Sequence, residues 1–263
     1  IEKERYETSN TILKCSVYDK QHNTMIEKDI FCKCMPILDP LYFLMNNYNT
    51  LIKRNPLLPS NYSYNSFNKI NDMNNSAYID TFFSFITSEL TLNNINPSFP
   101  IFYGSVSGIK KEMKYDITED YEDYKGEKWF YKTLGKTHTL DMYISSDESD
   151  DEIDDNTSED SYADDNEYIS LLQNMPCQNF FIEKLDGTLE DLLDKMENTN
   201  TDLILSCIFQ ISFALNYLQK HYNFTHNDLH VNNVMYTKTE KTFLYYKFNN
   251  IYFKVPTYGY IFK

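Results

Sequence analysis

The stretch that decides the fold runs from Phe224 to Tyr236 and reads FTHNDLHVNNVMY. It holds two His, one Asp and three Asn between apolar residues. A segment that only connects two elements does not need so many polar side chains. We therefore interpret it as the strongest candidate for a functional site in the sequence.

An apolar run, LILSCIFQISFALNYL at 203–218, directly precedes this stretch. It is shorter than the roughly 20 residues that a membrane span needs, and it contains Ser, Gln and Asn. We expect a buried helix of a soluble protein from Asp202 to about His221, and no membrane association. A rigid helix followed by a tight loop would let Asp228 and Asn233 face one cleft. Phosphoryl transfer needs such a pair, a carboxylate that takes a hydroxyl proton and an oxygen ligand for Mg²⁺.

The segment HNDLHVNN, residues 226–233, resembles the catalytic loop H-x-D-L-x-x-x-N of the protein-kinase-like superfamily. The matching residues are His226, Asp228, Leu229 and Asn233. The resemblance implies that Asp228 is the catalytic base, Asn233 a metal ligand and His226 a brace for the loop. The alternative for the motif alone is an ordinary polar turn after a buried helix.

Two upstream segments extend the resemblance, which covers about residues 11–263. FFIEKLDGTLEDLL is similar to the fifth strand, hinge and following helix of kinases, so Glu183 to Leu185 would offer backbone groups to adenine. Phe181 or Leu185 would contact the adenine ring. IFCKCMPI resembles the V-A-I-K strand, which makes Lys33 the candidate for pairing with the α- and β-phosphates.

Kinases pair that lysine with an acid on the next helix. Asp80 and Glu89 both lie on a predicted helix, Asn75–Leu92, whose apolar residues recur every three or four positions and whose Ser76 could cap it. Both acids stay open as the partner, and either could be an ordinary solvent-facing carboxylate. The composition and HNDLHVNNVMY look most like the kinase-like proteins of large nucleocytoplasmic DNA viruses.

Three departures from the kinase pattern stand out. The first glycine is Gly104, so no Gly-rich loop covers the nucleotide. Asn227 replaces the Arg that pairs with a phosphorylated activation loop, and His230 replaces the usual Lys. The sequence also ends at Lys263, before the D-F-G position. We therefore expect an incomplete C-terminal lobe, an exposed apolar patch around the 203–218 helix, low stability and weak or no activity for the chain as given.

The net charge of −15 is concentrated in one segment. Twelve acidic residues and no Lys or Arg lie between Asp147 and Glu167, which leaves −3 for the rest of the chain. Residues 145–168 are too polar and too highly charged to bury a core, so we expect a disordered acidic insertion. It could be phosphorylated or bind a basic partner. Five Cys without a CxxC pair suit reduced thiols in a cytoplasmic setting, where we place the chain.

The remaining pattern predicts an antiparallel strand pair at 10–19 and 28–38, a strand near 98–108, a helix from Thr188 with a capping-box start at Asp191, and two final strands. Residues 110–143 give no clear pattern. The expected fold is α+β, a bilobal protein-kinase-like fold with an N-lobe-like part, 1–182, and the start of a helical lobe, 183–263.

The expected function is an ATP- and Mg²⁺-dependent phosphotransferase, a Ser/Thr protein kinase, in host cytoplasm or virion if viral. We expect no nucleic acid as a partner. The alternatives are a pseudokinase that acts as a binding scaffold and a small-molecule kinase. His230 favours the latter.

Overall fold

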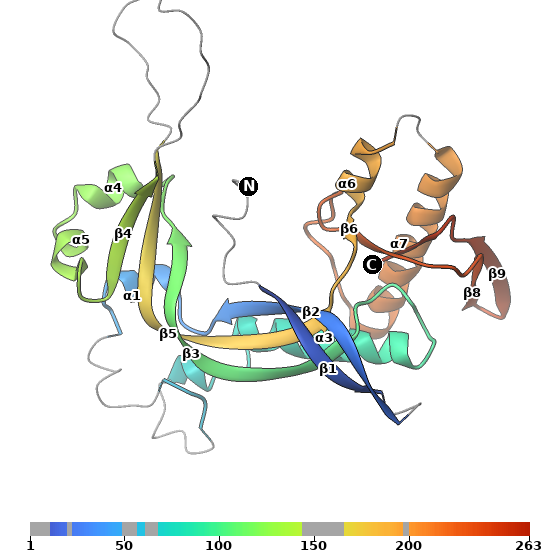
Figure 1. The fold of residues 1–263 in the computed structure, drawn as a ribbon, viewed down its shortest axis with the longest axis horizontal. Coiled ribbons are helices and arrows are strands. Elements are labelled where there is room, and N and C mark those ends of the chain that lie inside the picture. The colour runs from blue at the N-terminus through green and yellow to red at the C-terminus, as the bar shows by residue number, and fades with distance from the viewer. Residues whose placement is uncertain (1–10, 20–22, 49–56, 61–67, 144–165, 197–199) are drawn as a thin grey trace, which may run out of the picture. The chain divides into compact units, whose positions relative to one another are not determined.

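The structure is a computed structural model, and it describes residues 11–19, 23–48, 57–60, 68–143, 166–196 and 200–263 (Figure 1). The strands are β1 Thr11–Asp19, β2 Thr24–Pro36, β3 Phe102–Asp116, β4 His138–Tyr143, β5 Glu167–Glu183, β6 Gly187–Thr188, β7 Met235–Lys238, β8 Phe243–Phe248, β9 Ile251–Pro256 and β10 Tyr260–Phe262. The helices are α1 Pro40–Leu44, the 3-10 helix η3 Asn68–Ile70, α3 Ser76–Leu92, α4 Tyr121–Lys125, α5 Lys128–Thr133, α6 Leu189–Asp194 and α7 Thr201–Tyr222.

The fold is a mixed α and β structure with a curled antiparallel sheet, which is compatible with the predicted α+β class. The sheet has the strand order β1-β2-β5-β3, with β4 paired to β5. The predicted antiparallel pair is confirmed, because β1 and β2 pair without interruption from Thr11↔Cys32 to Asp19↔Thr24. The bilobal kinase-like form stays a prediction.

The predicted helix at 75–92 is confirmed as α3, but its cap is Asn75 rather than Ser76. The side chain of Asn75 accepts a hydrogen bond from the amide of Ala77 at 3.0 Å and donates to the carbonyl of Ile37 at 2.7 Å. Asn is a better cap than most residues because its oxygen satisfies an amide of the first turn. The unassigned region 110–143 contains the end of β3, α4, α5 and β4.

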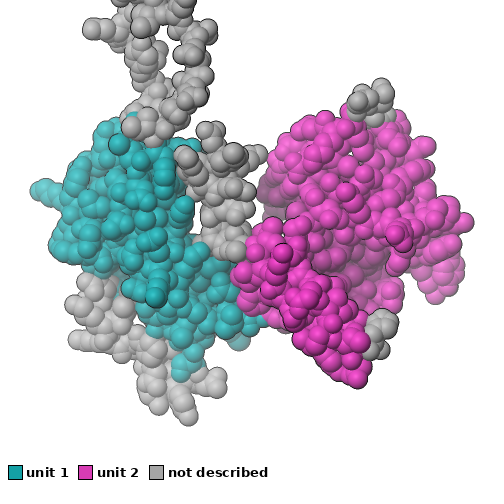
Figure 2. Space-filling view, in the orientation of Figure 1, with its two compact units in different colours: residues 1–10, 33–79, 105–179 teal, residues 11–32, 80–104, 180–263 magenta. Residues whose placement is uncertain are grey.

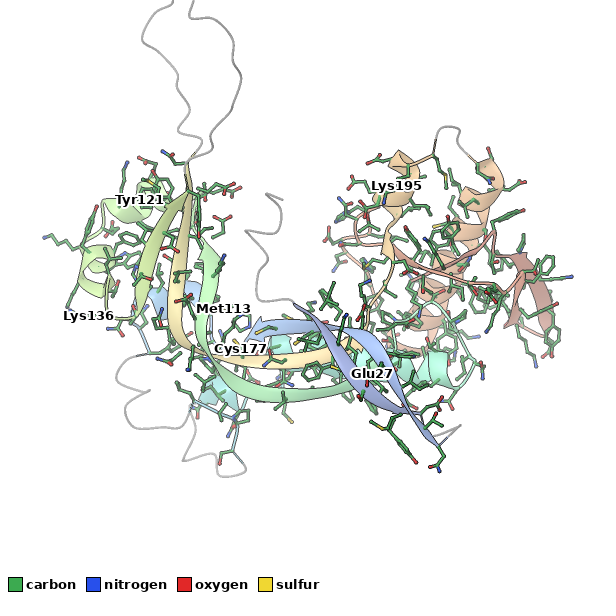
Figure 3. All side chains as sticks on the ribbon, in the orientation of Figure 1. Glu27, Met113, Tyr121, Lys136, Cys177 and Lys195 are labelled. Atoms are coloured by element: carbon green, nitrogen blue, oxygen red, sulfur yellow. The ribbon has the colours of Figure 1, made fainter. Side chains whose placement is uncertain are left out.

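The chain forms two compact units (Figure 2). The first unit comprises residues 1–10, 33–79 and 105–179, and the second comprises 11–32, 80–104 and 180–263. The first has its own hydrophobic core, which includes Met113 and Cys177 on neighbouring parts of the sheet (Figure 3). The division at 182 and 183 stays a prediction, although β5 does end at Glu183. Most of the predicted acidic insertion, 145–168, lies outside the described residues.

The second unit is built around α7, which has a hydrophobic cluster on each of two sides. Leu203 and Cys207 pack with Val234, Tyr236 and Phe262, while Phe209 and Phe213 pack against the β8–β9 hairpin. Burial raises the pKa of Cys207 to about 12, so this side chain is a neutral thiol near pH 7. The hairpin turns through Asn249 and Asn250, both at positive φ, which suits a tight two-residue turn.

α7 passes a test of length and composition for a membrane span, and it is the one helix in the described part of the chain that does. Core helices of soluble proteins pass the same test. Leu205 and Ile208 are 59% and 55% exposed, so α7 is less completely covered than its all-round apolar sequence suggests. Its packing in two clusters favours the predicted core helix, and the cytoplasmic location stays a prediction.

Candidate functional site

The candidate loop is positioned by the way α7 ends. Asn223 adopts the left-handed conformation, with φ 51° and ψ 34°, and its amide donates to the carbonyls of Gln219 and Leu218. Asn tolerates this conformation better than most residues, so it stops the helix and turns the chain. At the other end, the side chain of Asn200 caps α7 by accepting from the amide of Leu203 at 3.2 Å. Both ends of the supporting helix are therefore fixed by local sequence.

The polar residues of α7 hold the strands beside the loop. Gln210 is completely buried, and its Oε1 accepts from the amide of Phe262 at 2.9 Å. Its Nε2 donates to Ser206 Oγ at 3.1 Å and to the carbonyl of Tyr260 at 3.4 Å. Ser206 Oγ in turn donates to the carbonyl of Pro256 at 2.6 Å. These bonds explain why an otherwise apolar helix carries Ser and Gln: they satisfy backbone groups of β9 and β10.

The first residues of the loop are held by aromatic packing. The ring of Phe224 stacks on that of Phe83 in α3, with centroids 4.9 Å apart and an interplanar angle of 16°. His226 meets Phe224 edge to face at 6.0 Å. The Nδ1 atom of His226 is buried and has no hydrogen-bond partner among the described residues. His226 is half-buried, and its role as a brace for the loop stays a prediction.

Asp228 and Asn233 are in direct contact across the loop. Asn233 Nδ2 donates to Asp228 Oδ2 at 3.0 Å and to the backbone carbonyl of Asp228 at 2.8 Å. The side chain of Asp228 is 81% exposed, so its carboxylate is accessible. The amide nitrogen of Asn233 holds the loop closed, and its Oδ1 accepts no hydrogen bond among the described residues. The loop therefore presents an oriented carboxylate beside an amide oxygen.

His230 is oriented toward the same carboxylate. Its Nδ1 accepts from the amide of Asn232 at 3.3 Å, which assigns the ring proton to Nε2 in the neutral form. Nε2 lies 3.8 Å from Asp228 Oδ1, beyond hydrogen-bond distance but within reach of a small rotation. An imidazole nitrogen thus stands near the carboxylate of Asp228.

The chain leaves the loop on a small sheet with the strand order β10-β7-β6. The amide of Leu189 donates to the carbonyl of Val234 at 2.7 Å, and Met235 and Lys263 exchange two backbone bonds of 2.8 Å. Gly187 lies against the buried ring of Tyr236, where an added Cβ would stand 3.0 Å from Oη and 3.2 Å from Cε1 and Cζ. A Cβ at this position would therefore fit only if the ring moved by a few tenths of an ångström.

The segment predicted to contact adenine is anchored at its two ends. The amide of Glu183 donates to the carbonyl of Ile101 at 2.8 Å, and its carboxylate pairs with Lys263 Nζ and accepts from the amide of Ile101 at 3.1 Å. Asp186 Oδ2 accepts from the amide of Lys238 at 2.7 Å. Leu185 between them is half-buried. Backbone recognition of adenine by Glu183 to Leu185 stays a prediction.

The other predicted residues are not all in one unit. Lys33 is half-buried on β2 in the first unit, whereas Asp80, Glu89, Asp228 and Asn233 belong to the second. Asp80 is half-buried on α3, and Glu89 is exposed and accepts from Asn93 Nδ2 at 3.3 Å. The phosphate-binding role of Lys33, and the choice of its acidic partner, stay predictions.

A cavity of about 930 Å³ in the second unit brings together two residues that the sequence singled out. Glu89 and Phe181 both line it, with Lys28 and Ile30 of β2, Val17 of β1 and Tyr103 of β3 among the other lining residues. None of residues 226–233 lines it. Within the described residues no three His, Cys, Asp or Glu side chains gather as a metal site.

Sequence reasoning missed several residues that shape the site. The pair of Glu183 and Lys263 joins residues 80 positions apart, and the stack of Phe83 on Phe224 joins α3 to the loop. Neither contact has a local sequence signal. Gln210 did have one, because a buried Gln on an apolar helix face must hydrogen-bond to a specific partner.

Comparison with known proteins gives a partial similarity. No family model matches the chain. A segment of 77 residues, 28% of this chain, is 39% identical to uncharacterized protein 098R of invertebrate iridescent virus 6. The match covers 13% of that protein's length, so the chain spans far less than two thirds of it. The chain is therefore similar over part of its length to a protein of an iridescent virus.

Proposed function

We propose that the chain belongs to a phosphotransferase of the protein-kinase-like superfamily that transfers phosphate from ATP to a hydroxyl group. The observation that carries the proposal is the contact between Asp228 and Asn233, at 3.0 Å, on an exposed loop that directly follows α7. Catalysis of phosphoryl transfer depends on positioned oxygens more than on covalent chemistry. A carboxylate and an amide oxygen side by side suit that requirement.

Asp228 would accept the proton of the attacking hydroxyl. Its carboxylate is exposed to an incoming substrate while Asn233 fixes its direction. His226 would support the loop from the protein side, because its ring packs on Phe224. A residue that orients a hydroxyl and takes its proton typically contributes about 10²- to 10⁴-fold to the rate.

Asn233 fits the role of a ligand for Mg²⁺. Its Nδ2 is used within the loop, which leaves the carbonyl oxygen as the group available to a hard cation. The ion would neutralise charge on the phosphates.

The order of elements supports the proposal independently of the loop. After the antiparallel pair β1–β2 come two short helical elements, the long helix α3 and three further strands of the same sheet, with α4 and α5 between β3 and β4. A short linker, two helices, the loop and the strands β7 to β10 follow. The sequence of a strand pair, a long helix, further strands, a linker, two helices and the loop is compatible with the order that the resemblance implies, and α4 and α5 are additions to it. The most direct acceptor is a Ser or Thr hydroxyl of a protein, and Lys33 with Asp80 or Glu89 would complete the triphosphate site.

The test compares Asp228→Asn with the unchanged full-length protein in an assay of phosphate transfer from labelled ATP. We expect transfer to fall by about 10²-fold or more, because the amide cannot take a proton, while ATP binding changes little. Asp202→Asn, an exposed acid in the first turn of α7, is the matched control and should retain full activity. Unchanged transfer by the Asp228 variant would remove this residue from the mechanism, and ATP binding without transfer by the unchanged protein would favour the pseudokinase.

His230 favours a second acceptor class, a small molecule with a hydroxyl group. His230 stands where Ser/Thr protein kinases usually have a lysine, and small-molecule kinases of the same superfamily tolerate other residues at this position. Screening protein and small-molecule hydroxyl acceptors with the same labelled ATP separates the two. Labelling of small molecules alone would reject the protein-kinase assignment.

A further inference from the structure

The outer face of the β8–β9 hairpin combines aromatic rings with lysines. The pairings Phe243↔Pro256, Tyr245↔Lys254 and Lys247↔Tyr252 place six side chains on the face that points away from α7. The opposite face carries Leu244, Tyr246 and Val255, which are buried against α7. One side of the hairpin is thus core, and the other is a surface of rings and lysines.

This outer face is strongly exposed. Tyr245 and Tyr252 are 70% and 69% exposed, and Phe243 is 37% exposed. Aromatic side chains of this size are seldom left so open, and exposed apolar surface ringed by polar groups often marks an interaction site. The face therefore has contact area to offer to a partner.

The lysines of the face are held in place by the rings. Lys254 Nζ lies 3.9 Å from the ring centre of Phe243, and Lys247 Nζ lies 5.4 Å from that of Tyr252. Cation–π contacts of this kind restrict the side chains before any ligand binds. The positive charges are pre-positioned.

The face is positive in a protein that is negative. Residues 243–256 contain two lysines and no Asp or Glu, although the whole chain carries −15. Ammonium groups and tyrosine hydroxyls are hydrogen-bond donors, so the face suits a ligand rich in acceptor oxygens. The face is less suited to stacking nucleic-acid bases, because the lysine ammonium groups already lie over the rings of Phe243 and Tyr252.

We propose that the outer face of the β8–β9 hairpin is a docking surface for an acidic peptide segment, one rich in Asp and Glu. Lys247 and Lys254 bind carboxylates, and Tyr245, which lies between them on the face, provides contact area and a hydroxyl donor. The sequence between Asp147 and Glu167 of this chain, with its twelve acids, is an example of the chemistry that would bind. The surface is independent of the residues proposed for phosphate transfer.

The test measures binding of a fluorescent synthetic peptide with the sequence of residues 145–168, by anisotropy at low and at physiological salt. The peptide is titrated with two hosts: the full chain, and a full-chain variant whose acids between 147 and 167 are changed to Asn and Gln. The variant removes competition between the peptide and the chain's own acidic segment. We expect saturable binding that weakens with salt, and about tenfold weaker binding for Lys247→Glu/Lys254→Glu. Both lysines are exposed, so the core of the hairpin is unaffected.

Two controls make the outcome decisive. Lys128→Glu/Lys132→Glu on α5 changes the net charge equally and should leave binding unchanged, and a peptide with Asn and Gln in place of the acids should not bind. Tyr245→Ala should weaken binding with little change in salt dependence. The proposal is overturned if neither host binds the peptide, if both double variants lose binding equally, or if a single-stranded oligouridylate binds the face more tightly than the peptide. None of these outcomes depends on phosphate transfer.

Discussion

Gln210 joins α7 to β10 from a fully buried position, and its replacement by Met tests how the second unit is held together. Gln210→Met keeps the length of the side chain but removes the acceptor of the Phe262 amide and the donor to the Tyr260 carbonyl. Phe262 is itself completely buried, so its amide finds no water in place of the lost oxygen.

The expected cost follows from these bonds. An unsatisfied buried amide costs about 1–3 kcal/mol, and the long bond to Tyr260 adds less. Ser206 Oγ keeps its bond to the Pro256 carbonyl, so its loss is small. The added apolar burial of Met returns about 1 kcal/mol. We expect a net loss of about 2 kcal/mol in the free energy of unfolding, which corresponds to a fall of roughly 4–8 °C in Tm for a chain of this size.

Urea unfolding followed by circular dichroism measures the effect as a shift in midpoint at constant slope. Gln219→Met is the matched control, since Gln219 is an exposed glutamine on the same helix, and it should stay within about 0.5 kcal/mol of the unchanged chain. Equal stability of the two variants would show that Gln210 does not hold β10, and the assignment of its hydrogen bonds would be wrong.

Three further perturbations have defined outcomes. Glu183→Leu removes the carboxylate that pairs with the ammonium of Lys263, whose side chain is 4% exposed. It should lower the free energy of unfolding, measured with urea, by about 3 kcal/mol. The double variant Glu183→Leu/Lys263→Met should recover part of that loss, and no recovery would refute the pairing. Gly187→Ala forces a Cβ against the ring of Tyr236 and should cost about 1–3 kcal/mol, whereas Gly126→Ala, whose nearest neighbour is 3.8 Å away, should cost less than about 1 kcal/mol. Burial lowers the pKa of His138, so the unfolded chain binds its proton first, and the free energy of unfolding should fall as the pH drops through about 6.5, the usual pKa of a histidine. His138→Phe should flatten this fall, and an unchanged slope would exclude His138 as its source.

Local sequence signals account for most of what could be predicted. The capping box of Thr188 and Asp191 is present, with Oγ1 accepting from the Asp191 amide at 3.1 Å, because both groups lie within one turn. The contact of Asp228 with Asn233 is similarly local. The apolar residues of α3 and α7 recur with helical spacing over several turns, which predicts a helix but does not fix where the helix begins and ends. Only the caps and bounds of these two helices therefore needed correction.

What could not be predicted depends on long-range packing. The region 110–143 alternates short helices and strand ends, and its apolar residues acquire a pattern only when Phe130 and Leu172 meet in one core. The sequence pattern predicts β9 and β10 as one strand. The structure separates them by a turn at Thr257 to Gly259, which is recognised only because β10 pairs with β7. The charge pattern of the sequence does not predict that Lys263 is buried against Glu183.

The division of four continuous elements between the two units has a practical consequence. The chain passes from one unit to the other inside β2, α3, β3 and β5, as well as between residues 10 and 11. No single truncation yields either unit intact, and a protease cut in one connecting loop cannot release a folded half. Fragment-based expression of this protein should therefore fail at any chosen breakpoint, and a destabilising change in either core should lower the solubility of the whole chain.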